Sequence, residues 1–250
     1  MAEGAAAALA TPGLVWMLLT IAVAGVVCGF TGFGTAMILM PVATRFVPAA
    51  EVIAVLVATG IAASAQLVPP AWRMAHRGEV GRLLIGALVA VPAGVWLLAR
   101  LDLTVLRWVV AAAAAVLLIL LVRGWRWPGR PGVGGLVGIG AGSGLLGGLT
   151  GLTGPPVILF YLSGPRAAAE VRANTILYLN ALNVVVAGNL AVQGLITTRA
   201  LWLAAVMAPA YLLAMAAGQA AFAPGRERGY RNAAYGVIAL AILSGLPVFD

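Results

Sequence analysis

Charged residues divide this chain into eight long stretches that are mostly apolar. The stretches cover residues 4–44, 52–72, 83–99, 108–122, 131–165, 173–198, 200–225 and 232–249. A helix needs about 20 residues to cross the hydrocarbon core of a bilayer, so six of the stretches suit one helix each. The other two, at 41 and 35 residues, are too long for a single crossing. The pattern predicts an all-α polytopic membrane protein in which residues 4–44 and 131–165 each form two segments.

The two longest stretches contain a similar pattern of glycine and threonine. "GFTGFGTAMILMP" starts at Gly29 and "GLTGLTGPPVILF" starts at Gly148. Glycine and proline end a helix and let a new one start. Backbone groups freed in this way are tolerated inside a bilayer only where protein or a water-filled cavity surrounds them. We therefore expect a broken or re-entrant helix pair at each motif and about eight to ten transmembrane segments in total. The alternative is that the glycines only let helices pack closely.

The two motifs belong to a longer internal match. Residues 29–64 align without a gap on residues 148–183, with nine identities in 36 positions. Alanine-rich sequence raises such counts, but Gly-x-Thr-Gly and Ala-Ala-Glu-Val both match at the same offset. The chain is therefore predicted to consist of two homologous repeats, residues 1–125 and residues 131–250.

The distribution of arginine predicts how the repeats are oriented. Ten segments, five in each repeat, place the connecting loops on alternating sides of the membrane. The richer side is the cytoplasmic one by the positive-inside rule, so both termini are predicted to be periplasmic. An odd number of crossings in each repeat inverts the second repeat relative to the first. The richer side holds Arg73, Arg77, Arg82, Arg123, Arg126, Arg130, Arg166, Arg172, Arg226, Arg228 and Arg231, and the other holds Arg45, Arg100, Arg107 and Arg199.

Composition supports a membrane protein and argues against several classes of function. The chain is 63% hydrophobic and 9% charged, with a mean hydropathy of +1.06, which is more apolar surface than a soluble domain of this size buries. The arginines are scattered at segment ends with no basic run, so no nucleic acid is expected as a partner. One cysteine, Cys28, and one histidine, His76, leave no basis for a disulfide, a metal site, a cofactor or histidine-based catalysis.

The two helix breaks form a candidate site for a small anion. The half-helix after each break presents free N–H groups and the positive end of its dipole, which suits an anion. The spans hold no carboxylate, which argues against a cation carrier. Inverted repeats with broken helices are typical of secondary transporters, which bind substrate near the middle of the membrane. The candidate substrate-binding residues are Thr31, Gly32, Gly34, Thr35, Ser64, Thr150, Gly151, Thr153, Gly154, Asn180 and Asn183.

Several alternatives stay open at this point. Glu51 and Glu170 stand at the starts of the helices that follow the breaks, where they either cap the helix or couple transport to protons. The asparagines either bond helices together or contact the substrate. The alternatives to a transporter are a membrane-embedded enzyme, such as a lipid-pyrophosphate phosphatase, and an anion channel. Such an enzyme needs acids and arginines beside the break, and this chain has neither there.

The sequence resembles the TauE/SafE family of sulfite and sulfonate exporters, also called the toluene-sulfonate uptake permease family. The resemblance rests on the paired breaks, on "AAEVIAVLVATGIAAS" and "AAAEVRANTILYLNALN" after them, on the "AHRGEV" loop and on the glycine-spaced final helices. It covers nearly the whole chain. It implies a bacterial inner-membrane carrier of a small organic or sulfur oxyanion (sulfite, sulfonate or a sulfoacetate-like anion), and a homodimer is among the expected assemblies. The chain departs from the family where Pro155 and Pro156 follow Thr153 and Gly154, since members often have a longer glycine run and one proline there.

Overall fold

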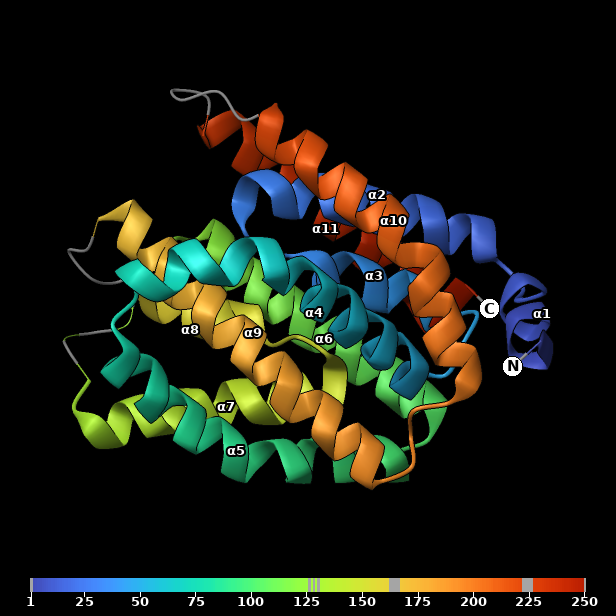
Figure 1. Ribbon diagram of the computed structural model, residues 1–250, viewed down its shortest axis with the longest axis horizontal. Helices are drawn as coiled ribbons and strands as arrows, with labels where there is room; N and C mark the ends of the chain where they lie inside the picture. The colour runs from blue at the N-terminus through green and yellow to red at the C-terminus, as the bar shows by residue number, and fades with distance from the viewer. Residues whose placement is uncertain are drawn as a thin grey trace.

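The computed structural model describes residues 2–125, 127, 129, 131–161, 167–221 and 227–249. Regular structure in these residues is entirely helical (Figure 1). This confirms the prediction of an all-α protein. The helices are α1 (Ala2–Leu9), α2 (Leu14–Thr31), α3 (Thr35–Ala43), α4 (Ala49–Met74), α5 (Arg77–Arg100), α6 (Leu103–Val122), α7 (Val133–Thr150), α8 (Gly154–Tyr161), α9 (Ala168–Val192), α10 (Thr198–Ala220), α11 (Glu227–Gly245) and the short 3-10 helix η1 (Pro247–Phe249).

Six of these helices, α2, α5, α6, α7, α9 and α10, are long and apolar enough to cross a membrane. Helix α4 makes a seventh if its two parts, Ala49–Ala65 and Leu67–Met74, count as one span bent by 70°. Helices α3 and α8 have nine and eight residues, so at 1.5 Å per residue they are about 13 and 12 Å long and cannot cross alone. The chain is a multi-pass membrane protein. Its full-length spans are fewer than the eight to ten segments expected, because each broken pair contributes one short helix, α4 is bent, and the apolar part of α11, Asn232–Gly245, is also short.

Both expected helix breaks are present. Helices α2 and α3 are separated by residues 32–34, and α7 and α8 by residues 151–153. The backbone turns at Gly32, Gly34 and Gly151, whose φ angles are 80°, 100° and 73°. Residues with a Cβ rarely adopt this left-handed region of φ. Glycine at these positions therefore lets the chain turn between the two helices.

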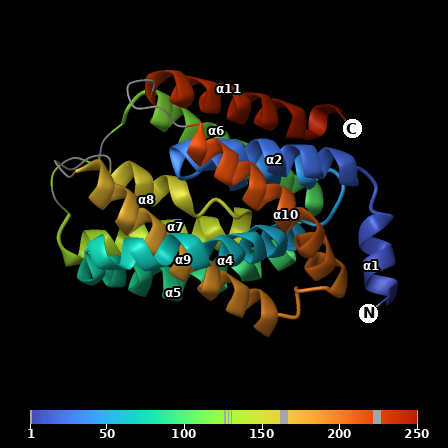
Figure 2. The same cartoon turned by 45° about the horizontal axis from the view of Figure 1, so that its top comes forward.

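Each broken pair is a helical hairpin, and the two hairpins enter the molecule from opposite ends. The ring of Phe46, which follows α3, fills the space beside Gly13, which precedes α2. Both outer ends of the α2–α3 hairpin therefore lie together, at the end of the molecule that carries both chain termini (Figure 1). The α7–α8 hairpin starts and finishes at the opposite end. Figure 2 shows the bundle from another side, with α1 lying across its terminal end.

Helices of the two halves pack on one another in a reciprocal pattern. Helix α2 lies along α10 as α7 lies along α5, α3 packs on α11 as α8 packs on α6, and α4 packs on α9. These pairs stay the same when α2–α6 are exchanged with α7–α11. The backbones approach closely where glycine removes the side chain: a Cβ on Gly29 would overlap the carbonyl oxygen of Met215 in α10, and one on Gly140 would overlap that of Leu83 in α5.

The matched helices α4 and α9 run antiparallel. Near the start of α4, Glu51 accepts a hydrogen bond from Arg199 Nε, just beyond the end of α9, at 2.9 Å. Near the start of α9, the carboxylate of Glu170 lies 3.1 Å from His76 Nε2, just beyond the end of α4. Asn174 Oδ1 accepts from the backbone N–H of His76 at 2.7 Å and adds a second contact at this end. The start of each helix therefore contacts residues that follow the end of the other helix.

Arginines that the sequence assigns to opposite sides of the membrane lie at opposite ends of the bundle. Arg45 donates to the carbonyl of Ser244 at 2.9 Å and Arg107 to that of Gly245 at 3.2 Å, both at the terminal end of α11. Arg73 ends α4 and Arg77 begins α5 at the other end. The segregation agrees with the sequence, and the assignment of the arginine-rich end to the cytoplasm stays a prediction.

Candidate functional site

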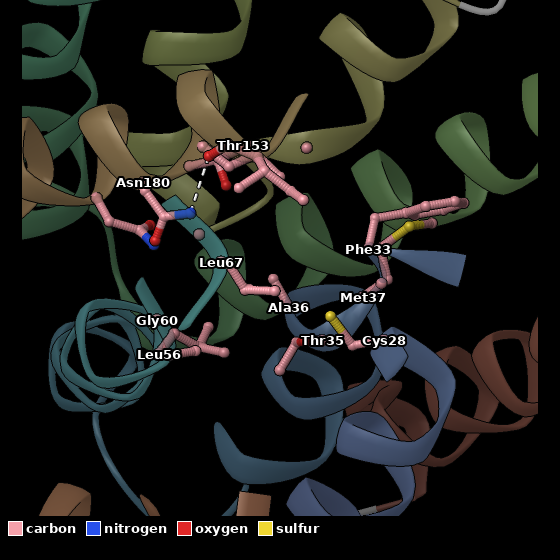
Figure 3. A pocket seen from close by; sticks show the side chains of 18 of the residues that line it. Cys28, Phe33, Thr35, Ala36, Met37, Leu56, Gly60, Leu67, Thr153 and Asn180 are labelled. Carbon is pink, nitrogen blue, oxygen red and sulfur yellow. Dashed lines mark hydrogen bonds between the residues drawn. The ribbon is translucent and has the colours of Figure 1, made fainter. Parts of the chain in front are cut away.

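The two helix breaks line one cavity of about 130 Å³ between the middle parts of α4 and α9 (Figure 3). For comparison, an engineered apolar cavity of about 150 Å³ holds a benzene molecule, so the space suits a small solute. In Figure 3, Cys28 and Thr35 lie across the cavity from Thr153 and Asn180. The lining residues are Cys28, Gly32, Phe33, Gly34, Thr35, Ala36, Met37, Leu56, Gly60, Ala63, Leu67, Gly151, Thr153, Gly154, Pro155, Ile176, Leu179, Asn180, Asn183 and Tyr211.

One polar cluster of the cavity wall joins three helices. The Thr35 and Tyr211 hydroxyls lie 3.1 Å apart and share a hydrogen bond between α3 and α10. The Tyr211 hydroxyl also lies 3.5 Å from Cys28 Sγ in α2. Tyr211 is 5% exposed, so packing fixes its hydroxyl at the cavity. Hydroxyl groups both donate and accept, and this cluster can therefore turn a donor toward a bound solute.

The other polar wall comes from α9. Asn180 and Asn183 both line the cavity. The Asn180 amide donates to the carbonyl of Ile176 on its own helix at 2.8 Å. Asn183 faces Gly60 of α4, and the part of the chain that the structure describes offers its amide no hydrogen-bond partner.

The two breaks present different numbers of backbone donors. Residues 35–37 open α3 and line the cavity, and the first α-helical bond there runs from the N–H of Ile38 to the carbonyl of Gly34 at 3.2 Å. The N–H groups of residues 35–37 thus have no partner within the helix. Pro155 and Pro156 open α8 and have no N–H to offer. The expectation of free amides after both breaks therefore suits α3 better than α8.

The described part of the lining contains no charged side chain. A bound anion would therefore be held by neutral hydroxyls, amides and the start of α3, where the helix dipole favours negative charge. Hydrogen bonds to an ionised acceptor are stronger than those between neutral groups. The arrangement can bind a compact anion without placing a counter-charge in the membrane.

The structure brings most of the predicted site residues together. Eight of the eleven candidates line the cavity: Gly32, Gly34, Thr35, Gly151, Thr153, Gly154, Asn180 and Asn183. The other three, Thr31, Ser64 and Thr150, lie outside the lining. Thr31 donates to the carbonyl four residues earlier at 2.7 Å and accepts from the N–H two residues later at 3.2 Å. Thr150 repeats both bonds at 2.7 and 3.4 Å, and Ser64 donates to the carbonyl of Ile61 at 2.6 Å.

Glu51 and Glu170 also lie outside the lining. Glu51 is 8% exposed and pairs with Arg199, whereas Glu170 is 27% exposed and pairs with a largely exposed His76. Capping and coupling were the two roles left open by the sequence. Contact with a basic side chain of the other half of the chain is a third role, which the sequence did not indicate.

Twelve of the 20 lining residues were not among the candidates from the sequence, and three of these carry polar groups or create space in the wall: Cys28, Gly60 and Tyr211. Tyr211 stands in an apolar stretch that carries neither break nor repeat motif, and Gly60 is an isolated glycine within a helix. For Cys28 the sequence indicated only that it has no partner for a disulfide. The Gly-Thr motifs could not identify Tyr211 or Gly60, because these residues lie outside the motifs and come close to the breaks only through the packing of the helices.

The sequence was compared with known proteins. It matches the family model described as Sulfite exporter TauE/SafE over residues 17–245. It is 29% identical over 222 residues to a protein of Cupriavidus necator named "Probable sulfite/organosulfonate exporter TauE", covering 83% of this chain and 84% of that relative. No solved structure matches the chain.

Proposed function

Because the chain belongs to the TauE/SafE sulfite exporter family, we propose that it carries a small sulfur oxyanion or organic sulfonate across the bacterial inner membrane through the cavity between its helix breaks. Membership also makes it a membrane transporter and not an enzyme, as the resemblance in the sequence implied. The observation that carries the proposal is that two breaks, far apart in the chain, line one cavity.

The chemistry of the wall supports an anionic substrate. The Thr35 and Tyr211 hydroxyls lie on one side of the cavity and the α9 asparagines on the other. A sulfur oxyanion or sulfonate has three oxygens on one sulfur, so it can accept bonds from both sides at once. The free N–H groups at the start of α3 add donors and a favourable dipole. Several such bonds can offset the loss of hydration when the anion enters the membrane.

The arrangement of the helices supports alternating access by inverted repeats, residues 1–125 and 131–250. The reciprocal packing, the antiparallel α4–α9 pair and the hairpins that enter from opposite ends are the features expected of such repeats. Rocking of one repeat against the other would expose the cavity to one side of the membrane at a time. On this proposal both termini are periplasmic.

Transport by purified protein in proteoliposomes tests the function. Labelled sulfite and methanesulfonate should cross with saturable kinetics, and choline should not cross. Flux that rises without saturation would indicate a channel instead of a carrier. Equal flux in protein-free vesicles would contradict the proposal.

The chain's single cysteine tests whether the cavity is the binding site, because Cys28 lines it. With each rate divided by that for a free thiol, a methanethiosulfonate reagent that bears a sulfonate should label Cys28 faster than its trimethylammonium counterpart. Methanesulfonate should slow the labelling, and choline should not. Labelling that ignores both the charge of the reagent and the presence of methanesulfonate would place the substrate elsewhere.

A further inference from the structure

Gly60 and Asn183 meet where α4 and α9 face each other across the cavity wall. A Cβ built on Gly60 would overlap Asn183 Nδ2, and within 4 Å it would otherwise meet just Asn183 Cγ among the described residues. The space that a side chain at position 60 would take is therefore filled by the amide group of Asn183. Both residues line the cavity.

The hydrogen bonds of α9 set Asn183 apart from its neighbours. Asn180 and Asn189 each turn the side-chain amide back to the carbonyl four residues earlier, at 2.8 and 2.9 Å. Asn174 accepts from the backbone of His76. Asn183 makes neither kind of bond within the described chain. Its amide leaves its own helix and extends toward α4, into the gap at Gly60.

The Asn183 amide is half-buried and has no hydrogen-bond partner among the described residues. The lining beside it is largely apolar, with Leu56 and Ala63 on α4 and Leu179 on α9. Polar groups away from bulk water are normally hydrogen-bonded, and one that lacks a partner usually meets a water or a ligand. A bound anion supplies the missing acceptor, and one of the two Asn180 amide hydrogens is already bonded within its own helix.

We propose that Gly60 is a positioning residue: by lacking a side chain it keeps the Asn183 amide in the cavity wall, where that amide donates to an oxygen of the transported anion. The inference rests on the proposed function of the cavity. It assigns the α9 contact with the substrate to one asparagine and explains why α4 has glycine opposite it.

A double-mutant cycle tests the inference, with affinity for sulfite and for methanesulfonate measured as stabilisation of the purified protein against heat. Gly60→Ala should displace the amide and weaken binding about tenfold, and Asn183→Ala should weaken it about tenfold by removing the amide. The double variant should also lose about tenfold, not about a hundredfold, because both changes disable the same contact.

Two control variants separate positioning from general damage. A Cβ at Gly188 meets no described atom within 4 Å, and Asn189 bonds to its own helix, so Gly188→Ala and Asn189→Ala should bind normally. If Gly60→Ala folds poorly, Asn183→Ala in the same chain should restore folding, because it removes the overlapping amide.

Multiplying losses in the double variant would overturn the inference, as would Gly60→Ala protein with lower thermal stability but unchanged affinity. Failure of the unsubstituted protein to bind either anion would instead overturn the proposed function. The two failures are therefore distinguishable.

Discussion

Threonine occupies matching positions in both breaks, and at each position its hydroxyl bonds to its own helix. Thr31 and Thr150 both donate to the carbonyl four residues earlier and accept from the N–H two residues later. The accepted bond satisfies a backbone N–H in the break that has no partner within a helix, and the donated bond holds the hydroxyl against its own helix. The sequence predicted the breaks correctly, but it could not tell which side chains near a break face the cavity. That depends on the direction of the chain after the turn.

We expect Thr31→Val and Thr150→Val to lower stability by about 1 to 2 kcal/mol each, because each loses a hydroxyl that makes two intramolecular hydrogen bonds. Both variants should bind anion as the unsubstituted protein does. Thr35→Val should instead weaken anion binding, since the Thr35 hydroxyl lies in the cavity wall. Thermal unfolding with and without methanesulfonate measures both effects. Weaker binding in the Thr31 variant at unchanged stability would return that hydroxyl to the site.

Tyr211→Phe removes the hydroxyl that lies between Thr35 and Cys28 and leaves the ring in place. We expect anion affinity to fall about threefold to tenfold, with a small change in melting temperature. Tyr235→Phe is the matched control, because its hydroxyl bonds to the carbonyl of Leu121 and lies outside the cavity lining. Equal affinities in the two variants would exclude Tyr211 from the site.

At the scale of helices, both interpretations of the glycine motifs are correct, at different positions. Gly29 and Gly148 begin the two motifs and pack against the backbones of α10 and α5. Gly32 and Gly151, three residues later, turn the chain. A sequence pattern shows that a small residue is required, but the reason lies in a partner helix that is distant in sequence. Packing partners such as α5 with α7 were therefore beyond prediction from the chain alone.

Two glycines in α7 provide a direct test of this packing. A Cβ on Gly140 would overlap the carbonyl oxygen of Leu83, so we expect Gly140→Ala to lower stability by about 2 kcal/mol. A Cβ on Gly138 would meet no described atom within 4 Å, so Gly138→Ala should be neutral or stabilising by up to about 1 kcal/mol. Unfolding in detergent by heat compares the two variants. Equal stability would mean that α5 and α7 lie farther apart.

At the scale of the whole molecule, the Glu51–Arg199 ion pair and the Glu170–His76 contact join one half of the chain to the other. Glu51→Gln removes one partner of the more buried pair and should lower stability by about 1 to 3 kcal/mol. This loss is smaller than that for a fully buried pair, because the Arg199 side chain is 34% exposed. Glu170→Gln should lower it by less than about 1 kcal/mol, because His76 is 64% exposed. Heat unfolding measures both. A variant that stays stable and binds anion but no longer transports would make its glutamate a coupling residue instead.

The predicted orientation can be tested by labelling intact cells. In a Cys28→Ser background, Val248→Cys lies at the terminal end of the bundle and Gly78→Cys at the arginine-rich end. Both positions are exposed. A maleimide that cannot cross membranes should reach Val248→Cys from outside and should reach Gly78→Cys only after the cells are opened. The reverse result would place the termini in the cytoplasm.

The two prolines that open α8 make the α3 side and the α8 side of the cavity wall unequal. The start of α3 keeps its backbone N–H groups, whereas Pro155 and Pro156 of α8 have none, so on the proposed function we expect more backbone donors to the anion from the α3 side. A carrier with identical walls would show the same half-saturation concentration from either face of the membrane. This one should show a different half-saturation concentration on each face, offset by a different maximal rate, so that no net flow occurs when the concentrations are equal.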